Sequence, residues 1–418
     1  MTAPGSLGAH PRRQAAIAFI LVTAVLDVMA LGIVIPVLPG LIEEFTGSNA
    51  RAGFINGVFV AIWAVMQFLC SPLIGSLSDR FGRRPIVLIS SAGLALDYVL
   101  LALAPSLWWL ALARIIGGIT TASFSTASAY LADVTPPEGR AKAFGLIGAA
   151  WSAGFVLGPL VGGVLGEMGG RTPFWAAAAL QAVVFAYGLL VLPESLAPEK
   201  RMPFSWRRAN PLGSLRLLSS HPELQGLAGV NFLLWFSHHV FTAVFVLYAA
   251  QRFGWGPIEV GGMLALVGVL DIIVQAFVTG PAVKRYGDRN VMVAGLLGGA
   301  VGLAVMGLAT TPFGFIASLL PNAMWRLAMP TLQSLMTRRV SESEQGQLQG
   351  ANSSVQSIAG ILSPLFFGWI YSRTSGDDPF MDLPGTAFVI AAVVLAFSAL
   401  LGWRVCLREP TGAPAAAE

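Results

Sequence analysis

Charged residues are scarce in this chain: only 11% of its 418 residues are Asp, Glu, Lys or Arg, whereas 55% are hydrophobic. A soluble globular protein usually carries about 25% charged residues. This deficit, with a mean hydropathy of +0.72, excludes a large soluble core and indicates an integral membrane protein. Only two cysteines occur, Cys70 and Cys406, so the sequence indicates no disulfide framework, and we expect no metal and no cofactor.

The sequence also lacks the motifs of enzymes and of nucleotide-driven pumps. No HExxH, GxSxG or GxxxxGKS/T segment occurs, so hydrolytic chemistry and ATP-driven transport are not indicated. An intramembrane enzyme would need a nucleophile with its base, or metal ligands. A sensor built on a transporter scaffold would need an appended cytoplasmic domain, and the tails are short. We therefore expect neither an enzyme nor a nucleic-acid-binding protein.

What the chain has instead is a series of long apolar runs. A helix needs about 20 mostly apolar residues to cross a bilayer. The first run is too long for a signal-peptide core and is expected to be retained. We predict an all-α membrane protein with twelve transmembrane helices near residues 14–39, 52–74, 85–104, 107–132, 142–165, 173–193, 223–250, 257–281, 289–310, 312–337, 346–372 and 384–406.

The positions of Lys and Arg predict the orientation of these helices. With both termini in the cytoplasm, only four of the 25 Lys and Arg residues fall on the opposite side of the membrane, and two lie within spans. This bias agrees with the positive-inside rule. The four on the opposite side are Arg51, Arg171, Arg252 and Arg373.

The chain also contains an internal duplication. Arg80, Gly82 and Arg84 recur 205 residues later as Arg285, Gly287 and Arg289, and Gly145, Pro159 and Gly163 recur as Gly350, Pro364 and Gly368. We predict two pseudo-symmetric six-helix bundles, residues 1–193 and 223–418, joined by a cytoplasmic linker, residues 194–222. Two such repeats with a site between them are a common solution for alternating access.

Five charged side chains lie inside the apolar runs: Asp27, Asp97, Arg114, Asp271 and Arg326. A charge near the bilayer centre costs at least ~2.5–3.5 kcal/mol, so it requires a partner, water or a function. Burial favours the neutral form of a carboxyl group. Asp27, halfway along the first span, is therefore suited to bind a proton or a substrate, and Arg114 is expected to pair with Asp27 or Asp97.

Several segments resemble a known transporter superfamily. GSLSDRFGRRP, from Gly75, resembles the signature loop of major facilitator superfamily transporters, and ALARIIGG, from Ala111, looks like their fourth-helix arginine motif. Gly154, Gly158 and Pro159 match the glycine–proline motif of the drug/proton antiporter branch. LDVMALGIVIPVLPGLIEEF, from Leu26, and QGQLQG, from Gln345, are similar to segments of bacterial tetracycline efflux proteins.

This resemblance implies roles for the matching residues. It implies a gating latch, which stabilises the outward-facing form, at Gly75, Asp79, Arg80, Gly82, Arg83 and Arg84. It implies a hinge or seal at Gly154, Gly158 and Pro159, and proton coupling at Asp27, Asp97 and Arg114. The alternatives are that the arginines only obey the positive-inside rule and that the glycines serve ordinary close packing. By position, Asp79 could cap a helix N-terminus and pair with an arginine, whereas Lys284 replaces this acid in the second repeat, which predicts a weaker latch.

The chain departs from the tetracycline pumps in its second half. Asp271 stands where the eighth helix of those pumps has a histidine, and GLLGGAVG, with Gly298 and Gly299, lacks their ninth-helix acid. Arg326 stands where they have small residues. We consider Asp271 a further proton-coupling candidate. One hypothesis, which we favour, pairs Asp271 with Arg326; the other lets Arg326 face the cavity and bind an anionic or carbonyl-rich substrate.

Polar side chains within the spans are candidates for substrate binding: Asp27, Gln67, Asn231, His239, Arg326 and Gln333. The amides could equally bond one helix to another. His238 and His239 point about 100° apart on a helix, so both cannot line the same wall.

Together these features predict a proton-coupled exporter of tetracycline-type or other lipophilic drugs, acting by alternating access as a monomer in the inner membrane of a bacterium. Its expected partners are the small-molecule drug, protons and the lipid bilayer. The alternative is a transporter of the same superfamily that moves a natural metabolite, such as a sugar, an amino acid or a siderophore.

Overall fold

The computed structural model describes residues 9–121, 123–136, 139–204, 210–211, 213–341, 344–375 and 383–407. Every regular element in this part of the chain is helical. The elements are α1 (Ala9–Val34), α2 (Leu38–Thr46), α3 (Asn49–Phe81), α4 (Arg83–Leu103), α5 (Leu107–Thr120), α6 (Ser123–Val134), α7 (Arg140–Met168), α8 (Thr172–Val191), η2 (Pro198–Lys200), η3 (Gly213–Leu215), α9 (Arg216–Ser220), α10 (Pro222–His238), α11 (Val240–Phe253), α12 (Pro257–Ile273), η4 (Val274–Val278), α13 (Thr279–Leu308), α14 (Pro312–Ala317), α15 (Leu319–Ala323), η5 (Met324–Leu327), α16 (Ala328–Thr337), α17 (Gln345–Thr374) and α18 (Thr386–Leu407).

Nine helices of the described chain are long and apolar enough to cross a membrane. The sequence predicted twelve spans, and the difference has structural causes. The stretch Pro257–Leu308 is continuous enough to count once although it covers two predicted spans. The predicted spans 107–132 and 312–337 are divided into shorter helices, α5 with α6 and α14 to α16. The protein is therefore an all-helical, multi-pass membrane protein.

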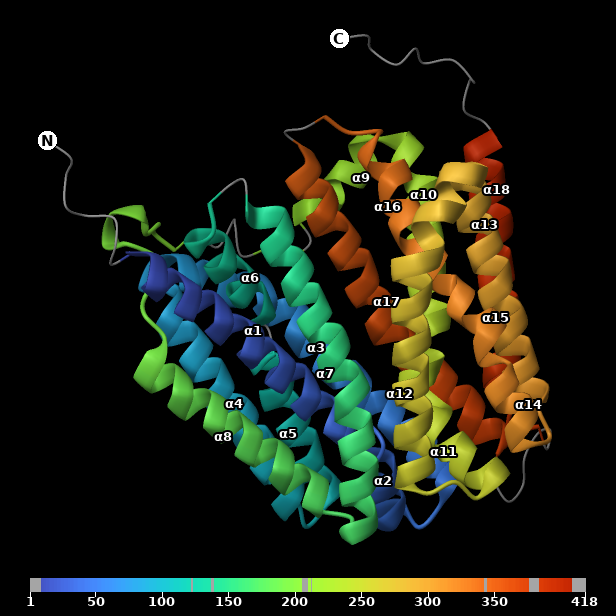
Figure 1. The fold of residues 1–418 in the computed structure, drawn as a ribbon. Helices are drawn as coiled ribbons and strands as arrows, with labels where there is room; N and C mark the ends of the chain where they lie inside the picture. Colours follow the sequence, from blue (N-terminus) through green and yellow to red (C-terminus); the bar gives the residue numbers. More distant parts are fainter. Residues whose placement is uncertain are drawn as a thin grey trace, which may run out of the picture. The chain divides into compact units, whose positions relative to one another are not determined.

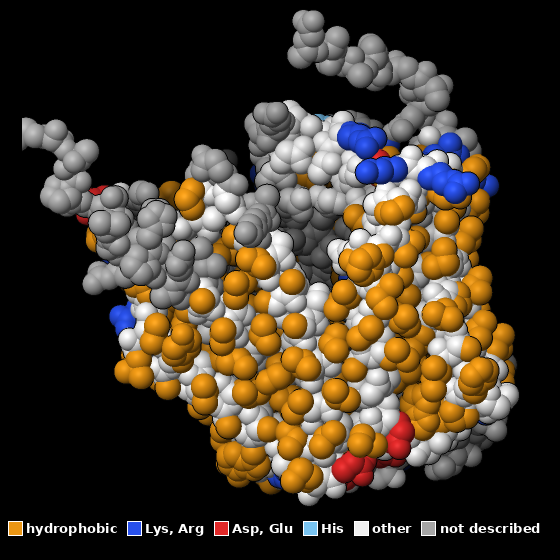
Figure 2. All heavy atoms as spheres, in the orientation of Figure 1, with side chains coloured by type: hydrophobic (Ala, Val, Ile, Leu, Met, Phe, Trp, Pro, Cys, Tyr) orange, Lys and Arg blue, Asp and Glu red, His pale blue; other side chains and the backbone are white. Residues whose placement is uncertain are grey.

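The outer faces of these helices are apolar. Large hydrophobic side chains such as Ile89, Leu103 and Phe277 are more than half exposed, as a lipid-facing surface requires. Figure 2 shows hydrophobic side chains along the helices on the face in view, with Lys and Arg gathered at one end of α13 and α18.

The described chain forms two compact units. The first contains residues 1–213 with 241–269 and 364–382, and the second contains residues 214–240, 270–363 and 383–418. In the first unit α1 packs on α7 and α8, and α4 packs on α5 and α8 (Figure 1). In the second, α13 packs on α18, α16 and η5. The predicted division into halves at the linker stays a prediction.

Glycine allows α7 to lie directly on α1. A Cβ atom at Gly158 would lie 2.7 Å from the Met29 carbonyl oxygen and 2.8 Å from Cα of Gly32, and one at Gly154 would lie 2.7 Å from the Val25 carbonyl oxygen. These glycines are spaced by four residues, so they share one helix face. Small residues at such a face let two backbones approach closely in a membrane.

Backbone and side-chain contacts also join distant segments of the same unit, at the predicted extracellular end. A Cβ at Gly57 of α3 would overlap the Pro364 carbonyl of α17. The Asn56 amide donates to the carbonyls of Thr242 (3.2 Å) and Ala243 (2.8 Å). The Tyr371 hydroxyl bonds to Asn49 (2.7 Å) and Gln251 (2.6 Å). Segments that are far apart in the sequence therefore contact one another within this unit.

We predict that Gly158→Val destabilises the protein by about 1–3 kcal/mol, because the added side chain overpacks the α1–α7 contact. The measurement is the thermal unfolding midpoint of purified protein. Gly148→Val on the same helix is the control, since a Cβ there meets nothing within 4 Å. Equal stability of the two variants would show that the α1–α7 contact does not depend on Gly158.

Candidate transport site

Asp97 and Arg114 form a buried ion pair in the first unit. Nη2 of Arg114 lies 2.9 Å from both carboxylate oxygens of Asp97, and the two side chains are 7% and 2% exposed, arginine first. The glycines after the arginine create the space. A Cβ at Gly117 would lie 2.6 Å from Oδ2 of Asp97, and one at Gly118 would lie 2.5 Å from the Trp63 carbonyl oxygen of α3. The arginine motif thus supplies both the charged side chain of Arg114 and, at Gly117, the space that the Asp97 carboxylate occupies.

Asp27 has a different partner. Its Oδ1 accepts a hydrogen bond from Nε2 of Gln181 on α8 at 2.9 Å, and Gln181 is fully buried. The other amide atom, Oε1 of Gln181, is buried without a hydrogen-bond partner in the described chain. Of the two acids predicted as partners of Arg114, the structure selects Asp97, and it leaves Asp27 with a neutral amide.

Gln181 can serve both protonation states of Asp27. An amide carries a donor and an acceptor. Its N–H₂ group donates to the carboxylate, as observed. After a 180° rotation its oxygen can accept the O–H of the protonated acid. The hydrogen bond between Asp27 and Gln181 can therefore persist whether or not Asp27 carries a proton.

The signature loop is a network around the turn at Gly82. Gly82 has a φ of +105°, which disfavours any other residue. Arg83 pairs with Asp79 at 2.7 Å and with Asp133 at 3.2 Å. The predicted pairing of Asp79 is present, but the predicted capping role was wrong. Glu194, from the start of the linker, accepts from the backbone nitrogens of Arg83 (2.8 Å) and Arg84 (3.3 Å) at the N-terminus of α4.

The second repeat carries the corresponding ion pair with its charges exchanged. Gly287, 205 residues after Gly82, also has a positive φ, +76°. Nη2 of Arg338 lies 2.6 Å from Oδ2 of Asp288, which also accepts from Ser334 at 3.2 Å. Asp288 and Arg338 stand 205 residues after Arg83 and Asp133. The replacement of the acid by Lys284 therefore does not leave this loop without an interhelical ion pair.

Asp271 and Arg326 form a pair in the second unit, as the favoured hypothesis predicted. Nε of Arg326 donates to Oδ2 of Asp271 at 2.7 Å. Asp271 is 9% exposed and Arg326 is 30% exposed. The Trp325 side chain also interacts with Asp271, although neither its Nε1 nor Oδ1 of Asp271 meets hydrogen-bond geometry with a described group.

Both residues lie at irregular turns. Asp271 precedes a π-helical turn, Val274–Val278, and Arg326 lies in a 3₁₀ turn, Met324–Leu327. Such turns within a helix often mark functional sites. Pro330 contributes, because it has no N–H to bond to the carbonyl of Arg326, four residues earlier.

The glycine-rich stretch of α13 accommodates the turn that carries Arg326. A Cβ at Gly298 would lie 2.7 Å from Cβ of Met324, and one at Gly299 would lie 2.9 Å from Cβ of Trp325. At Gly302 it would lie 2.5 Å from backbone atoms of Asn322. Glycines rather than an acid in this stretch therefore leave room for the turn that carries Arg326.

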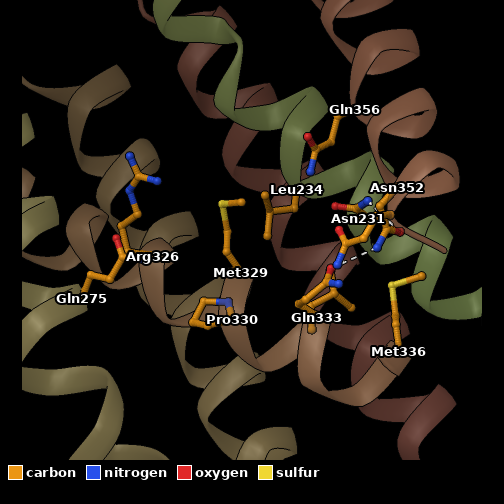
Figure 3. Close-up of a pocket in the computed structure, with 12 residues that line it drawn as sticks. Asn231, Leu234, Gln275, Arg326, Met329, Pro330, Gln333, Met336, Asn352 and Gln356 are labelled. Atoms are coloured by element: carbon orange, nitrogen blue, oxygen red, sulfur yellow. Dashed lines mark hydrogen bonds between the residues drawn. The ribbon is translucent and has the colours of Figure 1, made fainter. Parts of the chain in front are cut away.

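A pocket of about 350 Å³ opens beside Arg326, within the range of small-molecule sites. Figure 3 shows Gln275 next to Arg326 and the amides of Asn231, Gln333 and Asn352 joined in a chain. Among the described residues that line it, Arg326 is the only charged one; the others are Asn231, Leu234, Gln275, Met329, Pro330, Leu332, Gln333, Met336, Gln349, Asn352 and Gln356.

The structure thus brings together three of the predicted substrate-binding residues, Asn231, Arg326 and Gln333. Asp27 and Gln67 lie in the other unit. His239 follows α10 beside Trp235 and does not line the pocket.

Sequence reasoning missed several partners: Gln181, Asn352, Glu194 and the pair Asp288–Arg338. The 205-residue offset, applied to Arg83 and Asp133, would have found that pair. Gln181 and Asn352 carry no comparable signal, because buried amides in an apolar run have many possible partners.

The comparisons with known proteins give the family. The model of the Major Facilitator Superfamily matches residues 20–279 and 227–418, so the chain belongs to this superfamily of transporters. It is 39% identical to the class C tetracycline resistance protein of Escherichia coli, over 91% of this chain and 94% of that protein.

It is also 28% identical to multidrug resistance protein 2 of Bacillus subtilis, over 82% of this chain and 85% of that protein. Among solved structures, a bacterial homologue of the human lysosomal transporter Spinster shares the fold, with a TM-score of 0.77 at 17% identity. That match covers 96% of this chain and 98% of the other.

We predict that Asp97→Asn destabilises the protein by about 3–5 kcal/mol, because it leaves the buried Arg114 cation without its carboxylate. The measurement is thermal unfolding of purified protein. Asp27→Asn is the matched control: an asparagine there can still accept from Gln181, so its stability should stay within about 1 kcal/mol of the wild type. Equal losses in both variants would contradict the assigned pairing.

We predict that Arg338→Asp lowers stability by roughly 0.5–1 kcal/mol, because it places a second carboxylate beside Asp288. Adding Asp288→Arg reproduces the arrangement of the first repeat and should restore the unfolding midpoint. Arg285→Asp controls for a change of charge at this end of the helix. A double variant as unstable as the single would show that the two side chains do not act as a pair.

Proposed function

We propose that this protein is a proton-coupled exporter of tetracycline-type or other lipophilic drugs, acting by alternating access. The observation that carries the proposal is Asp27, a carboxyl group inside a span whose partner is a neutral amide rather than a cation. A carboxylate in a fully enclosed ion pair, as Asp97 is with Arg114, resists protonation, because it would leave a buried arginine unpaired. Asp27 is free of that constraint, and Gln181 can satisfy it with or without a proton.

The roles of the neighbouring charges follow from their contacts. Tyr98 interacts electrostatically with Asp27, Asp97 and Arg114, which supports a coupling between the ion pair Asp97–Arg114 and the proposed proton site. We propose that this pair responds to the charge on Asp27 and transmits it to α4 and α5. The latch at Gly75 to Arg84 would then hold or release the cytoplasmic end.

Substrate binding is assigned to the pocket of the second unit, with Asn231, Gln333 and Arg326 in contact with the drug. The polar side chains would orient the drug, and Leu234, Met329 and Met336 would provide apolar contact area. Such a combination is usual in small-molecule sites. Release would require the contacts at the predicted extracellular end, including the Tyr371 hydrogen bonds, to open. We place the protein in a bacterial cell membrane as a monomer, with both termini in the cytoplasm.

A natural metabolite remains the second candidate substrate, and the pocket itself favours it. An arginine with several amides would also hold the carboxylate or hydroxyl groups of a small polar solute. An amino acid, a sugar or a siderophore would each present such groups.

We predict that energised cells expressing the protein accumulate several-fold less tetracycline than cells with an empty vector. The difference should disappear with a protonophore and in Asp27→Asn, because export needs both the gradient and a group that exchanges protons. Gly148→Ala, at a position with open space, serves as the matched active control, and membrane levels of all variants are compared by immunoblot.

Export by Asp27→Asn at the wild-type rate would remove Asp27 from proton coupling. No export of tetracycline by any version, at wild-type membrane levels, would contradict the drug assignment. A panel of radiolabelled amino acids and sugars would then test the second candidate.

A further inference from the structure

Two groups in the pocket of the second unit offer hydrogen-bond donors to a ligand, and the first is a chain of amides. Nδ2 of Asn231 donates to Oδ1 of Asn352 at 3.4 Å, and Nδ2 of Asn352 donates to Oε1 of Gln333 at 3.0 Å. The chain of amides ends at Nε2 of Gln333, which is buried and has no hydrogen-bond partner in the described chain. A buried donor without an acceptor destabilises the empty pocket, so a ligand with an oxygen at this point is favoured.

Arg326 supplies the second set of donors. Its guanidinium has five N–H groups in a planar fork. Among the described residues the only hydrogen bond of this side chain runs from Nε to Asp271. The terminal nitrogens are left for the pocket, and the guanidinium also lies 4.5 Å from the Trp325 ring, which limits its orientation. Asp271 thus holds the side chain by its inner nitrogen and leaves the outer edge able to bind a carboxylate or enolate in bidentate fashion.

The spacing of the two donor groups limits the size of the ligand. Arg326 and Gln333 are seven residues apart, two turns along α16 and the turn before it, which is roughly 10 Å. A small anion cannot reach both. A molecule of several fused or linked rings, acidic at one edge and with carbonyl oxygens further along, can.

We propose that Arg326 is the residue of this pocket that recognises an acidic group on an extended, carbonyl-rich substrate, and that Asp271 is the positioning residue that orients it and binds a proton together with the substrate. This inference rests on the proposed function, since it specifies the substrate chemistry of the same pocket. It also joins the two hypotheses that the sequence left open: Arg326 pairs with Asp271 and faces the pocket.

The direction of the proton linkage follows from charge. With Asp271 ionised, the pair is neutral and an anionic substrate gains little. With Asp271 protonated, Arg326 carries an uncompensated positive charge and attracts the anion, because opposite charges interact strongly in a medium of low dielectric constant. Proton and anion therefore favour each other at this pair.

The other ionisable side chains near the pair are histidines. His238 stacks on Trp325 with ring centroids 3.9 Å apart and interacts electrostatically with Arg326 and His239. The glycine-rich face of α13, and the residues of α16 and α17 that line the pocket, contribute no ionisable group in the described chain.

The test is probe binding to the purified full-length protein in lipid nanodiscs. Anilinonaphthalene sulfonate stays anionic at all pH values near neutrality, and N-phenylnaphthylamine has the same rings without the charge. Both fluoresce in apolar sites, and empty nanodiscs supply the background. We expect Arg326→Gln to weaken binding of the sulfonate by tenfold or more, as expected for loss of a charge-assisted bond, and to leave the neutral probe unchanged.

The matched control is Arg289→Gln. Arg289 also lies over a tryptophan, 4.1 Å from the Trp403 ring, but it does not line the pocket, so both probes should bind as in the wild type. Arg326→Lys, which keeps the charge, serves if the glutamine variant fails to elute as a folded monomer. Its sulfonate affinity should lie between those of the wild type and the glutamine variant. Sulfonate binding that is unchanged in Arg326→Gln, or equally weakened in Arg289→Gln, would overturn the recognition role.

Asp271→Asn tests the linkage separately. Its side-chain oxygen can still accept from Nε of Arg326, but it carries no charge at any pH. Wild-type protein should bind the sulfonate more tightly as the pH falls from mildly alkaline to mildly acidic, whereas the variant should bind tightly and independently of pH. The same pH profile in both proteins would overturn the positioning role.

These readouts separate this inference from the proposed function. Loss of tetracycline export with intact, Arg326-dependent binding of the sulfonate would contradict only the assigned drug. Export that continues when Arg326→Gln still binds the sulfonate normally would contradict only the role of Arg326.

Discussion

The structure depends on one constraint: a charged or ionisable group inside an apolar layer needs an ion-pair or hydrogen-bond partner close to it. The chain meets it in three ways. Arg114 takes a carboxylate with almost no exposure, Arg326 takes one while keeping part of its surface exposed, and Asp27 takes an amide. The partners give these sites different properties. A fully enclosed ion pair resists a change of charge, whereas a carboxyl group beside an amide tolerates one.

Glycine and helix irregularity make each arrangement possible. Gly117 leaves the volume that the Asp97 carboxylate occupies, and the glycines of α13 admit the 3₁₀ turn with Trp325 and Arg326. Replacing an α-helical turn by a π or 3₁₀ turn changes the direction in which the following side chains point. Polar side chains that a regular helix would turn elsewhere are thereby aimed at the pocket, and this explains why Gln275 and Arg326 both reach it.

Much of the architecture could be predicted from the sequence, because hydropathy, charge bias and the 205-residue offset each report on a physical requirement. The superfamily and the location of the helices followed.

The span 312–337 was predicted as one helix, whereas Pro321 and Pro330 and the 3₁₀ turn divide it. The pairing of Arg114 with Asp97 rather than Asp27 could not be derived, since both acids lie in apolar runs and only three-dimensional packing separates them. The sequence suggested that Asp79 could cap a helix N-terminus, yet at α4 it is Glu194, 111 residues from Arg83, that accepts from the backbone nitrogen. Local pattern does not reveal such long-range partners.

The two acids outside the enclosed pair differ in their linkage to a drug. At Asp271, protonation leaves Arg326 positive and strengthens its hold on an acidic group. Asp27 bonds to an amide rather than to a cation, so its protonation removes a negative charge without leaving an unpaired positive one. An exporter that exchanges protons for drug needs at least one site where proton and drug exclude each other. If the second unit binds them jointly, this exclusion has to arise in the first unit, and Asp27, with Gln181 able to serve either state, is the group with the freedom to provide it.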